Sequence, residues 1–211
     1  RAASEAPRLL ELEWGHPDHP RVSVIGKGVC FDSGGLGLKA AKFMRLMKKD
    51  MGGGANAMGL AHMIMATDLP VRLHLLVPAV ENAVSAGAFR PGDVISSRKG
   101  LKVEIDNTDA EGRLVLGDAL TRACEDKPDL VLDFATLTGA ARVALGPEVM
   151  PFYTDDDDLA AALSGAGETV DDPLWRMPLW DGYDSYLEGE ISDLVNSDGS
   201  GFAGSITAAL F

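Results

Sequence analysis

Two stretches of the sequence bring together side chains that could bind metal ions and serve hydrolytic chemistry. Residues 26–54 are rich in glycine and contain two acids and no histidine, and residues 107–113 add two more acids and an arginine. Carboxylate oxygens are the ligands that hard and borderline divalent cations prefer. The two stretches therefore predict a divalent-cation site, and its candidate residues are Lys27, Asp32, Lys39, Asp50, Asp109, Glu111 and Arg113.

Glycine-rich segments beside a lysine also occur in nucleotide-binding loops, but the spacing here is wrong for them. The phosphate-binding loop needs GxxxxGK followed by Ser or Thr, and the dinucleotide loop needs GxGxxG; neither surrounds Lys27 or Lys39. A calcium-binding loop that began at Asp106 would place Ala110 and Gly117 at its fifth and twelfth positions, where oxygen ligands are needed. Both kinds of loop are disfavoured.

A simpler alternative is that these charged residues form surface salt bridges, each of which contributes little to stability. Against it, Lys27, Asp32 and Asp50 interrupt apolar or glycine-rich segments that otherwise suit a protein interior. Burying such charges is costly unless they pair with one another or hold a metal ion. The residues alone leave surface salt bridges and two-metal hydrolytic chemistry open as interpretations.

The elements that must position these residues alternate between strand and helix patterns. Buried strands are predicted at 22–31, 71–80 and 130–134, and helices after residue 54 and at 114–125. Such alternation favours parallel pairing through helical crossovers, so the predicted class is α/β with helices on both faces of the sheet. Asp32 directly follows the first strand, where α/β proteins place their sites.

Two local features outside these stretches have structural interpretations. Thr154 is predicted to cap a helix whose first turn holds the acids at 155–158, because a helix N-terminus favours negative charge. Cys30 and Cys124 lie far apart and form no CxxC pair. Both thiols are therefore predicted to pack as small core residues in a reducing compartment.

The composition is that of an ordinary globular protein with an acidic surplus. The chain of 211 residues is 46% hydrophobic and 24% charged, which suits one domain with a full core. A net charge of −13 disfavours nucleic-acid binding, which needs a surplus of Lys and Arg. No apolar run approaches the ~20 residues of a membrane span, and residues 1–14 lack the apolar segment of a secretory signal. A cytoplasmic protein without membrane contact is expected.

The two stretches resemble the signatures of the leucyl aminopeptidase family, also called the cytosol aminopeptidase or M17 family. The similarity continues through FATLTGAARVALG and GSITAALF and covers about residues 21–211. It implies an α/β fold in which a mixed, largely parallel sheet is sandwiched between helices. It also implies a metalloexopeptidase that hydrolyses N-terminal, leucine-like residues from peptides with a water that bridges two metal ions.

The resemblance also implies roles for individual residues. One metal ion is expected to bind Lys27, Asp32, Asp50 and Glu111, and the other to bind Asp32, Asp109 and Glu111. Zn²⁺ or Mn²⁺ is the expected cation, with Mg²⁺ or Co²⁺ able to replace it. Lys39 and Arg113 match catalytic residues that are not ligands. The substrate would contact Met47, Asp50, Thr136 and Gly139, and a bicarbonate ion would bind Gly112, Arg113 and Leu137.

Family organisation adds expectations about the whole protein. Residues 1–211 would form the catalytic domain, truncated at its C-terminal end and without the family's N-terminal domain. The full-length protein is expected to be a homo-hexamer that acts on peptides. Two other functions stay open: a DNA-binding regulatory relative, which the net charge of −13 disfavours, and a metal-binding fragment without catalytic activity.

Overall fold

The computed structural model describes residues 3–197 and 199–211, and its centre is a mixed sheet. Five strands of the described chain form this sheet: β1 (Arg8–Trp14), β2 (Arg21–Gly26), β3 (Gly28–Asp32), β4 (Arg72–Asn82) and β7 (Leu130–Phe134). They run in the order β1-β4-β2-β7, and β3 also pairs with β4. Only β1 is antiparallel to its neighbour; the pairs of β2 with β4, β2 with β7 and β3 with β4 are all parallel.

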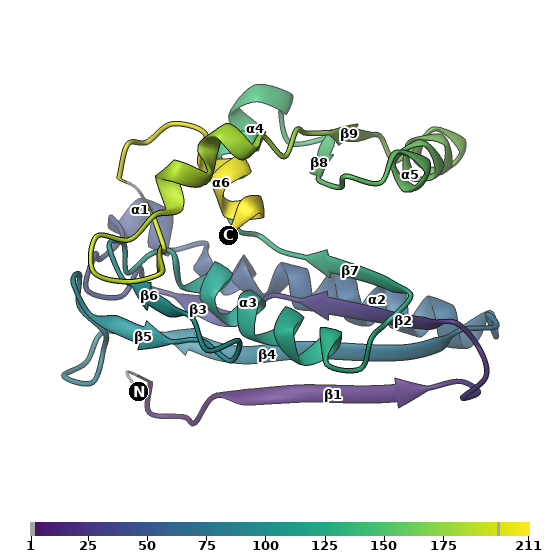
Figure 1. Cartoon of the computed structure of the whole chain (residues 1–211), viewed down its shortest axis with the longest axis horizontal. Helices are drawn as coiled ribbons and strands as arrows, with labels where there is room; N and C mark the ends of the chain where they lie inside the picture. The colour runs from purple at the N-terminus through teal and green to yellow at the C-terminus, as the bar shows by residue number, and fades with distance from the viewer. Residues whose placement is uncertain (1–2, 198) are drawn as a thin grey trace.

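Helices cover both faces of this sheet, α2 (Gly52–Ala66) on one and α3 (Glu111–Cys124) on the other (Figure 1). Side chains of β4 alternate between them, because successive residues of a strand point to opposite faces. Leu73 and Leu75 pack with Ala57 and Ala61 of α2, whereas Leu76 packs with a second cluster on α3. The predicted α/β class with a largely parallel sheet between helices is confirmed.

The first turn of α2 lies very close to the sheet, and this explains the run of glycines before it. A Cβ atom on Gly53 would lie 2.1 Å from the carbonyl oxygen of Phe134, and one on Gly26 would lie 2.6 Å from the Cα of Gly54. Only glycine fits at such a close approach of two backbones. The contact fixes the start of α2, and with it the short 3₁₀ helix η1 (Met47–Met51) that precedes it, beside the end of β2.

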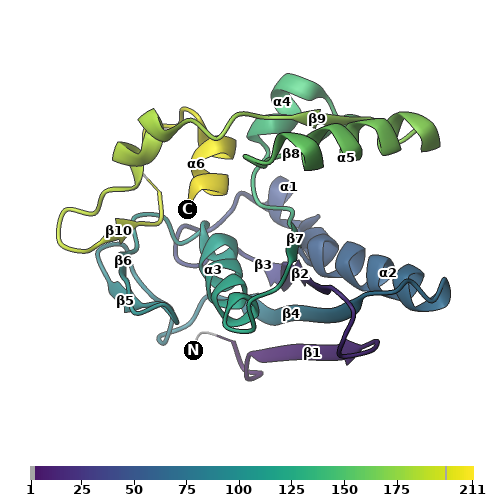
Figure 2. The same ribbon diagram turned by 45° about the vertical axis from the view of Figure 1, so that its right-hand side comes forward.

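The remaining elements lie outside the main sheet. A small sheet contains β5 (Val94–Ser96), β6 (Lys102–Glu104) and β10 (Leu194–Val195), and a two-stranded sheet pairs β8 (Met150–Phe152) with β9 (Leu174–Arg176). Figures 1 and 2 show α4, α5 and α6 above the main sheet. The bounds of the remaining helices are α1 (Ala41–Met44), α4 (Ala140–Leu145), α5 (Asp157–Val170), η2 (Asp181–Leu187) and α6 (Gly204–Leu210).

Two predicted element bounds differ from the structure at positions that matter for the site. The strand predicted at 22–31 is two strands, β2 and β3, that lie end to end along β4 with Lys27 between them. The helix predicted from 114 begins at Glu111. In both places a charged residue that periodicity would exclude from an apolar segment is buried, because other charged groups contact it.

The interpretations of the cysteines and of the acidic helix start were wrong in detail. Cys30 and Cys124 are both exposed, because Cys30 points away from the core on β3 and Cys124 ends α3. The N-cap of α5 is Asp156, whose carboxylate accepts a hydrogen bond of 2.9 Å from the amide of Leu159, so Thr154 lies two residues before the cap. Among residues 3–197 and 199–211, no helix combines the length and apolar character that crossing a bilayer requires.

Candidate metal centre

The predicted metal ligands lie where the parallel strands end. Asp32 is the last residue of β3, and Lys27 occupies the break between β2 and β3. Asp50 lies in η1, and Asp109 and Glu111 lie where the chain enters α3. The carboxyl ends of parallel strands meet at one edge of a sheet, and the helices that follow them begin there. Segments that are far apart in the sequence therefore bring their charged side chains to one place.

Three of the acids form a compact group. Asp32, Asp109 and Glu111 each offer a carboxylate oxygen, and these three oxygens all lie within 4.8 Å of one another. Lys39 faces this group: its Nζ lies 2.9 Å from Oδ2 of Asp32 and also contacts Oδ1 of Asp109. The group is the set of three residues that the family resemblance assigns to one metal ion.

Lys27 and Asp50 form a second part of the centre that shares Glu111 with the first. Nζ of Lys27 lies 2.7 Å from Oδ2 of Asp50 and 3.2 Å from Oε1 of Glu111. Lys27 and Asp50 are only 3% and 2% exposed, so these charges interact without screening by bulk water. The structure thus rules out surface salt bridges as the explanation of these residues.

The donor set fits divalent cations. Three buried carboxylate oxygens face lysine nitrogens but accept no hydrogen bond of ordinary geometry; they are Asp50 Oδ2, Asp109 Oδ1 and Glu111 Oε1. Four carboxylates face two lysines, which leaves a surplus of negative charge in a buried space. Oxygen ligands with one amine suit Mn²⁺, Mg²⁺ or Zn²⁺. Divalent cations could therefore supply the positive charge that the ammonium groups now supply.

Charges within the centre shift the protonation of its members in different directions. Burial opposes ionisation of Asp32, but hydrogen bonds from Lys39, Gly34 and Asn82 hold the pKa of Asp32 below its usual value. Burial raises the pKa of the Asp109 carboxyl more than the neighbouring Lys39 ammonium lowers it. The pKa of Lys39 is raised despite burial, because its ammonium lies against the carboxylates of Asp109 and Asp32. Lys39 is therefore a cation at neutral pH.

Burial strongly raises the pKa of Glu111, and this shift predicts how the stability of the protein depends on pH. Loss of hydration raises the pKa of Glu111 from 4.5 to about 7, and the nearby charge of Lys27 offsets only part of this. Between these values the folded protein keeps a proton that the unfolded chain has released, so raising the pH favours unfolding. Above about 7 the contribution no longer changes.

As the pH rises from about 4.5 to about 7, we expect the titration of Glu111 to lower the free energy of unfolding of the metal-free protein by up to about 3 kcal/mol. Glu111→Gln cannot titrate there and should lack this component. The free energies of unfolding of both proteins can be measured by urea denaturation in a chelator at several pH values. The difference between them isolates the contribution of Glu111, since the other acids titrate in both proteins. Parallel stability curves for the two proteins would contradict the assignment.

Two residues that the sequence did not single out fasten the loops that carry the ligands. Oγ1 of Thr108 accepts a hydrogen bond of 2.7 Å from the amide of Gly37 and donates one of 2.6 Å to the carbonyl of Gly34, and this ties the glycine-rich loop to the acidic loop. The side chain of Asn196 is fully buried and bonds the backbone of Asp106 and Asn107. Asn196 belongs to no motif, and Thr108 lies inside the acidic stretch 107–113, whose spacing does not indicate its bonds to Gly34 and Gly37.

Comparison with known proteins places the chain in a family. The family described as "Cytosol aminopeptidase family, catalytic domain" matches the chain over residues 1–211. The chain belongs to the cytosol aminopeptidase family. It is 48% identical to a probable cytosol aminopeptidase of Syntrophotalea carbinolica and 46% identical to one of Xanthomonas axonopodis pv. citri. Each alignment covers all of this chain and 43% of the relative, so the chain spans less than half the length of these relatives.

Solved structures agree with this assignment to the family. The crystal structure of the cytosol aminopeptidase from Coxiella burnetii superimposes with a TM-score of 0.96 at 56% identity, over 99% of this chain and 46% of that one. The bottromycin maturation enzyme BotP in complex with Mn superimposes with a TM-score of 0.93 at 40% identity, over 99% of this chain and 46% of that chain. The fold is therefore that of the cytosol aminopeptidases, and one protein with this fold is known to bind Mn.

Several residues that the family resemblance assigns to substrate or bicarbonate lie next to the ligands. Oγ1 of Thr136 is 2.9 Å from Oδ1 of Asp50 and holds this carboxylate in place. Met47 begins η1, three residues before Asp50, and Gly139 is the N-cap of α4. Gly112, Arg113 and Leu137 form the other group. A Cβ on Gly112 would lie 3.0 Å from Leu137, and the buried Arg113 guanidinium lies over the ring of Phe211.

Gly112 also leaves room for the side chain of Lys27. A Cβ atom at Gly112 would lie 2.5 Å from both Cε and Nζ of Lys27, so Gly112→Ala must displace the Lys27 nitrogen. We expect this variant to bind Mn²⁺ about 10-fold more weakly in calorimetric titrations. Gly117→Ala is the matched control, since Gly117 lies in the same helix and the nearest atom to its Cβ, on the ring of Phe211, is 3.9 Å away. It should keep the affinity and gain up to about 1 kcal/mol of stability. Equal affinities in the two variants would refute this role of Gly112.

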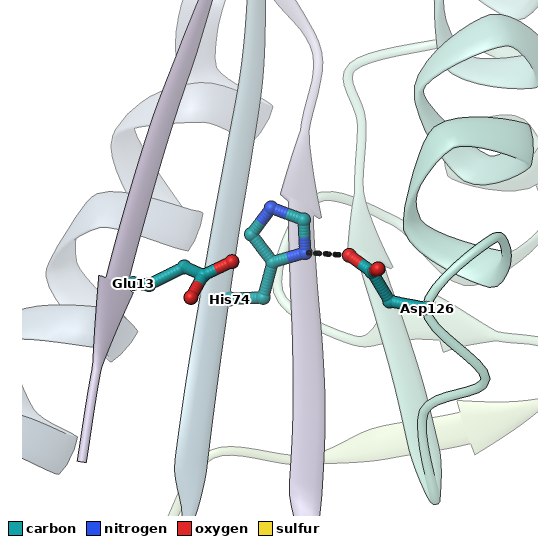
Figure 3. Close-up of side chains that lie close together, drawn as sticks. All are labelled: Glu13, His74 and Asp126. Atoms are coloured by element: carbon teal, nitrogen blue, oxygen red, sulfur yellow. Dashed lines mark ion pairs between the residues drawn. The ribbon is translucent and has the colours of Figure 1, made fainter. Parts of the chain in front are cut away.

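A second group of potential metal ligands lies at the other end of the sheet. Glu13, His74 and Asp126 each offer an atom within 4.8 Å of the others (Figure 3). Here arginines already neutralise the carboxylates: Arg72 lies 3.5 Å from Glu13, and Arg122 lies 3.0 Å from Asp126. His74 Nδ1 lies 3.8 Å from Asp126. This balance of charge favours an ion-pair network over a metal site.

Proposed function

We propose that the protein is a metal-dependent aminopeptidase that removes N-terminal residues from peptides. The observation that carries the proposal is the convergence of Asp32, Asp109 and Glu111 within 4.8 Å, with the Lys27–Asp50 pair bound to the same Glu111. Membership of the cytosol aminopeptidase family supports the same activity. A fragment that binds metal without catalysis would not need Lys39 at the centre of the acids.

The centre would hold two divalent cations, Mn²⁺ or Zn²⁺, with Mg²⁺ or Co²⁺ able to substitute. Asp32 and Glu111 would be shared by both ions, Asp109 would complete one set of ligands, and Lys27 and Asp50 would complete the other. Lys27 can offer a lone pair only after its ammonium proton has left. Once bound, the cations supply the polarising charge and the activated water on which hydrolysis depends.

The side chains that are not shared ligands would orient the peptide. Lys39 is cationic and lies beside Asp32 and Asp109, so it can donate to the carbonyl oxygen of the scissile bond as negative charge develops there. Asp50 would accept a hydrogen bond from the substrate's α-amine, which restricts cleavage to free N-termini. Thr136 holds Asp50 for this contact. Met47, Thr136 and Gly139 would surround a leucine-like first side chain.

Hydrolysis also needs a route for one proton from the attacking water to the amine that leaves. We assign this route to a bicarbonate ion held by the guanidinium of Arg113 and by the backbone at Gly112 and Leu137. Arg113 is buried in the first turn of α3, directly after Glu111 and Gly112. A group that carries the proton both ways serves as general base and then as general acid. A hexameric full-length protein in the cytoplasm completes the proposal.

Hydrolysis of leucine p-nitroanilide tests the proposed activity directly. The full natural protein, loaded with Mn²⁺ or Zn²⁺, should release p-nitroaniline, and removal of the metal by a chelator should stop the reaction. N-acetyl-leucine p-nitroanilide is the control substrate, because its amine is blocked and cannot contact Asp50. Absence of hydrolysis by the metal-loaded protein, or equal cleavage of both substrates, would overturn the proposal.

A further inference from the structure

The side chain of Asn82 touches both carboxylates that the two cations would share. Asn82 is the last residue of β4 and is 7% exposed. Its Nδ2 lies 2.9 Å from Oδ1 of Asp32 and 3.2 Å from Oε2 of Glu111, and it also donates to the carbonyl oxygen of Thr108 at 3.0 Å. A single amide group thus joins three segments of the chain: β3, the acidic loop and the start of α3.

These hydrogen bonds determine which carboxylate oxygens remain for other partners. Asn82 and the amide of Gly34 bond Oδ1 of Asp32, whereas Oδ2 of the same carboxylate faces Lys39. Likewise Asn82 bonds Oε2 of Glu111, and Oε1 faces Lys27. In both acids, the oxygen that Asn82 does not bond is the one directed at a lysine nitrogen, where a cation would bind.

The chemistry of an amide suits this place. Two carboxylates that lie this close repel each other, and a donor between them reduces the repulsion. A lysine or arginine there would also repel the incoming cations, whereas the neutral amide donates two hydrogens and adds no charge. Because three acceptors share these two hydrogens, one of the bonds must be bifurcated.

The backbone of Asn82 is itself held firmly. The register of the sheet pairs Asn82 directly with Asp32. Its carbonyl oxygen accepts hydrogen bonds from the amide of Ser33, at 3.0 Å, and from Oγ of Ser33, at 2.7 Å. The side-chain amide therefore extends from a fixed point toward both acids.

We propose that Asn82 is a positioning residue of the metal centre. Its side chain holds Asp32 and Glu111 at the separation and rotation that let one oxygen of each reach the cation positions. The inference rests on the proposed function, because it concerns the two ligands that both cations would share. It predicts that the uptake of the metal pair depends on the amide and not only on the packing of Asn82.

Calorimetric titration of the metal-free full natural protein with Mn²⁺ tests this role. Asn82→Leu keeps the approximate shape and removes both hydrogens, and we expect it to bind Mn²⁺ ~10–100-fold more weakly. Asn82→Ala removes the same hydrogens with less bulk and should weaken binding in the same direction, so it decides the question if the leucine variant does not fold. The electron paramagnetic resonance spectrum of bound Mn²⁺, which reports whether two ions are bridged, should change in both variants.

Ser33→Ala is the matched control, because it removes the buried bonds of the Ser33 hydroxyl to the Asn82 carbonyl and from the Gly35 amide. The bond from the Ser33 amide still holds the Asn82 backbone, and both hydrogen bonds from the Asn82 side chain to the carboxylates are kept. This variant should melt at a lower temperature and bind Mn²⁺ with unchanged affinity. If both Asn82 variants also melt lower but keep the Mn²⁺ affinity and spectrum of the unchanged protein, Asn82 is only structural and the inference is overturned. If the unchanged protein does not take up two Mn²⁺ ions, the proposed function itself fails, and the inference fails with it.

Discussion

Glu111→Gln is expected to prevent the protein from holding a pair of divalent cations. Glu111 is the acid that joins the two parts of the centre, since its Oε1 faces Lys27 and one of its carboxylate oxygens lies within 4.8 Å of oxygens of Asp32 and Asp109. A glutamine offers a neutral amide oxygen in place of the charged carboxylate. Loss of a supporting hydrogen bond to a ligand costs ~10–100-fold in metal affinity, so loss of a shared ligand should cost more than about 100-fold. The affinity for Mn²⁺, measured by titration, and the rate of peptide hydrolysis should both fall by at least this factor.

A stability measurement separates this loss of ligand from a failure to fold. Glu111 is 4% exposed and its burial opposes ionisation, so the metal-free glutamine variant should be at least as stable as the unchanged protein at pH 8. Glu81→Gln is the matched control, because Glu81 lies on β4 next to Asn82 and is exposed. It should bind the metal pair normally. Retention of two bound ions by Glu111→Gln would disprove the shared-ligand role.

Lys39→Ala should abolish most of the catalytic activity while the metal ions remain bound. Removal of one donor to a developing oxyanion reduces turnover by ~10²–10³-fold. In the metal-free centre the Lys39 ammonium contacts Asp32 and Asp109, so it competes with a cation for both. The variant is therefore expected to bind Mn²⁺ as tightly as the unchanged protein or more tightly. Metal analysis beside a leucine p-nitroanilide assay gives both quantities from one preparation.

The control for Lys39 is another lysine in the same region. Lys48 lies in η1 and is exposed, and Lys48→Ala should change neither metal content nor turnover. If Lys39→Ala loses its metal, then Lys39 supports the ligands instead of the reacting carbonyl. The direction of the change in metal affinity thus decides between the two roles, even where activity is lost in both cases.

The topology explains why several candidate residues of the metal centre, far apart in the sequence, lie close together. Asp32 ends a strand that pairs in parallel with β4, and Asp109 and Glu111 precede a helix that returns along the sheet. Parallel pairing brings such positions to one edge. The family resemblance assigns each residue to a ligand set, and the structure brings these residues close together; their roles as ligands stay a prediction. The class of fold followed from the same alternation of strands and helices.

Other features required the three-dimensional structure. Asn82, Thr108 and Asn196 are single polar residues whose partners are 26 to 90 residues away, and periodicity carries no information on such distances. Lys27 looked like one interruption of a single strand, because the sequence does not show that its ammonium group would meet Asp50 and Glu111 in the interior. The exposure of Cys30 depends on which face of β3 packs, and one outward residue of a short apolar run cannot be identified from composition.

The long strand β4 links the two polar clusters at the ends of the sheet. His74 lies between Glu11 and Asp126 near its start, and Asn82 bonds Asp32 and Glu111 at its end. Their positions differ by an even number, so both point to the face that α3 covers. If the strand slipped by one residue against its neighbours, both side chains would turn to the opposite face together and lose every one of these partners. A shifted register of β4 would therefore lose polar contacts at both ends of the strand. This loss disfavours mispaired folding products before any metal ion can bind.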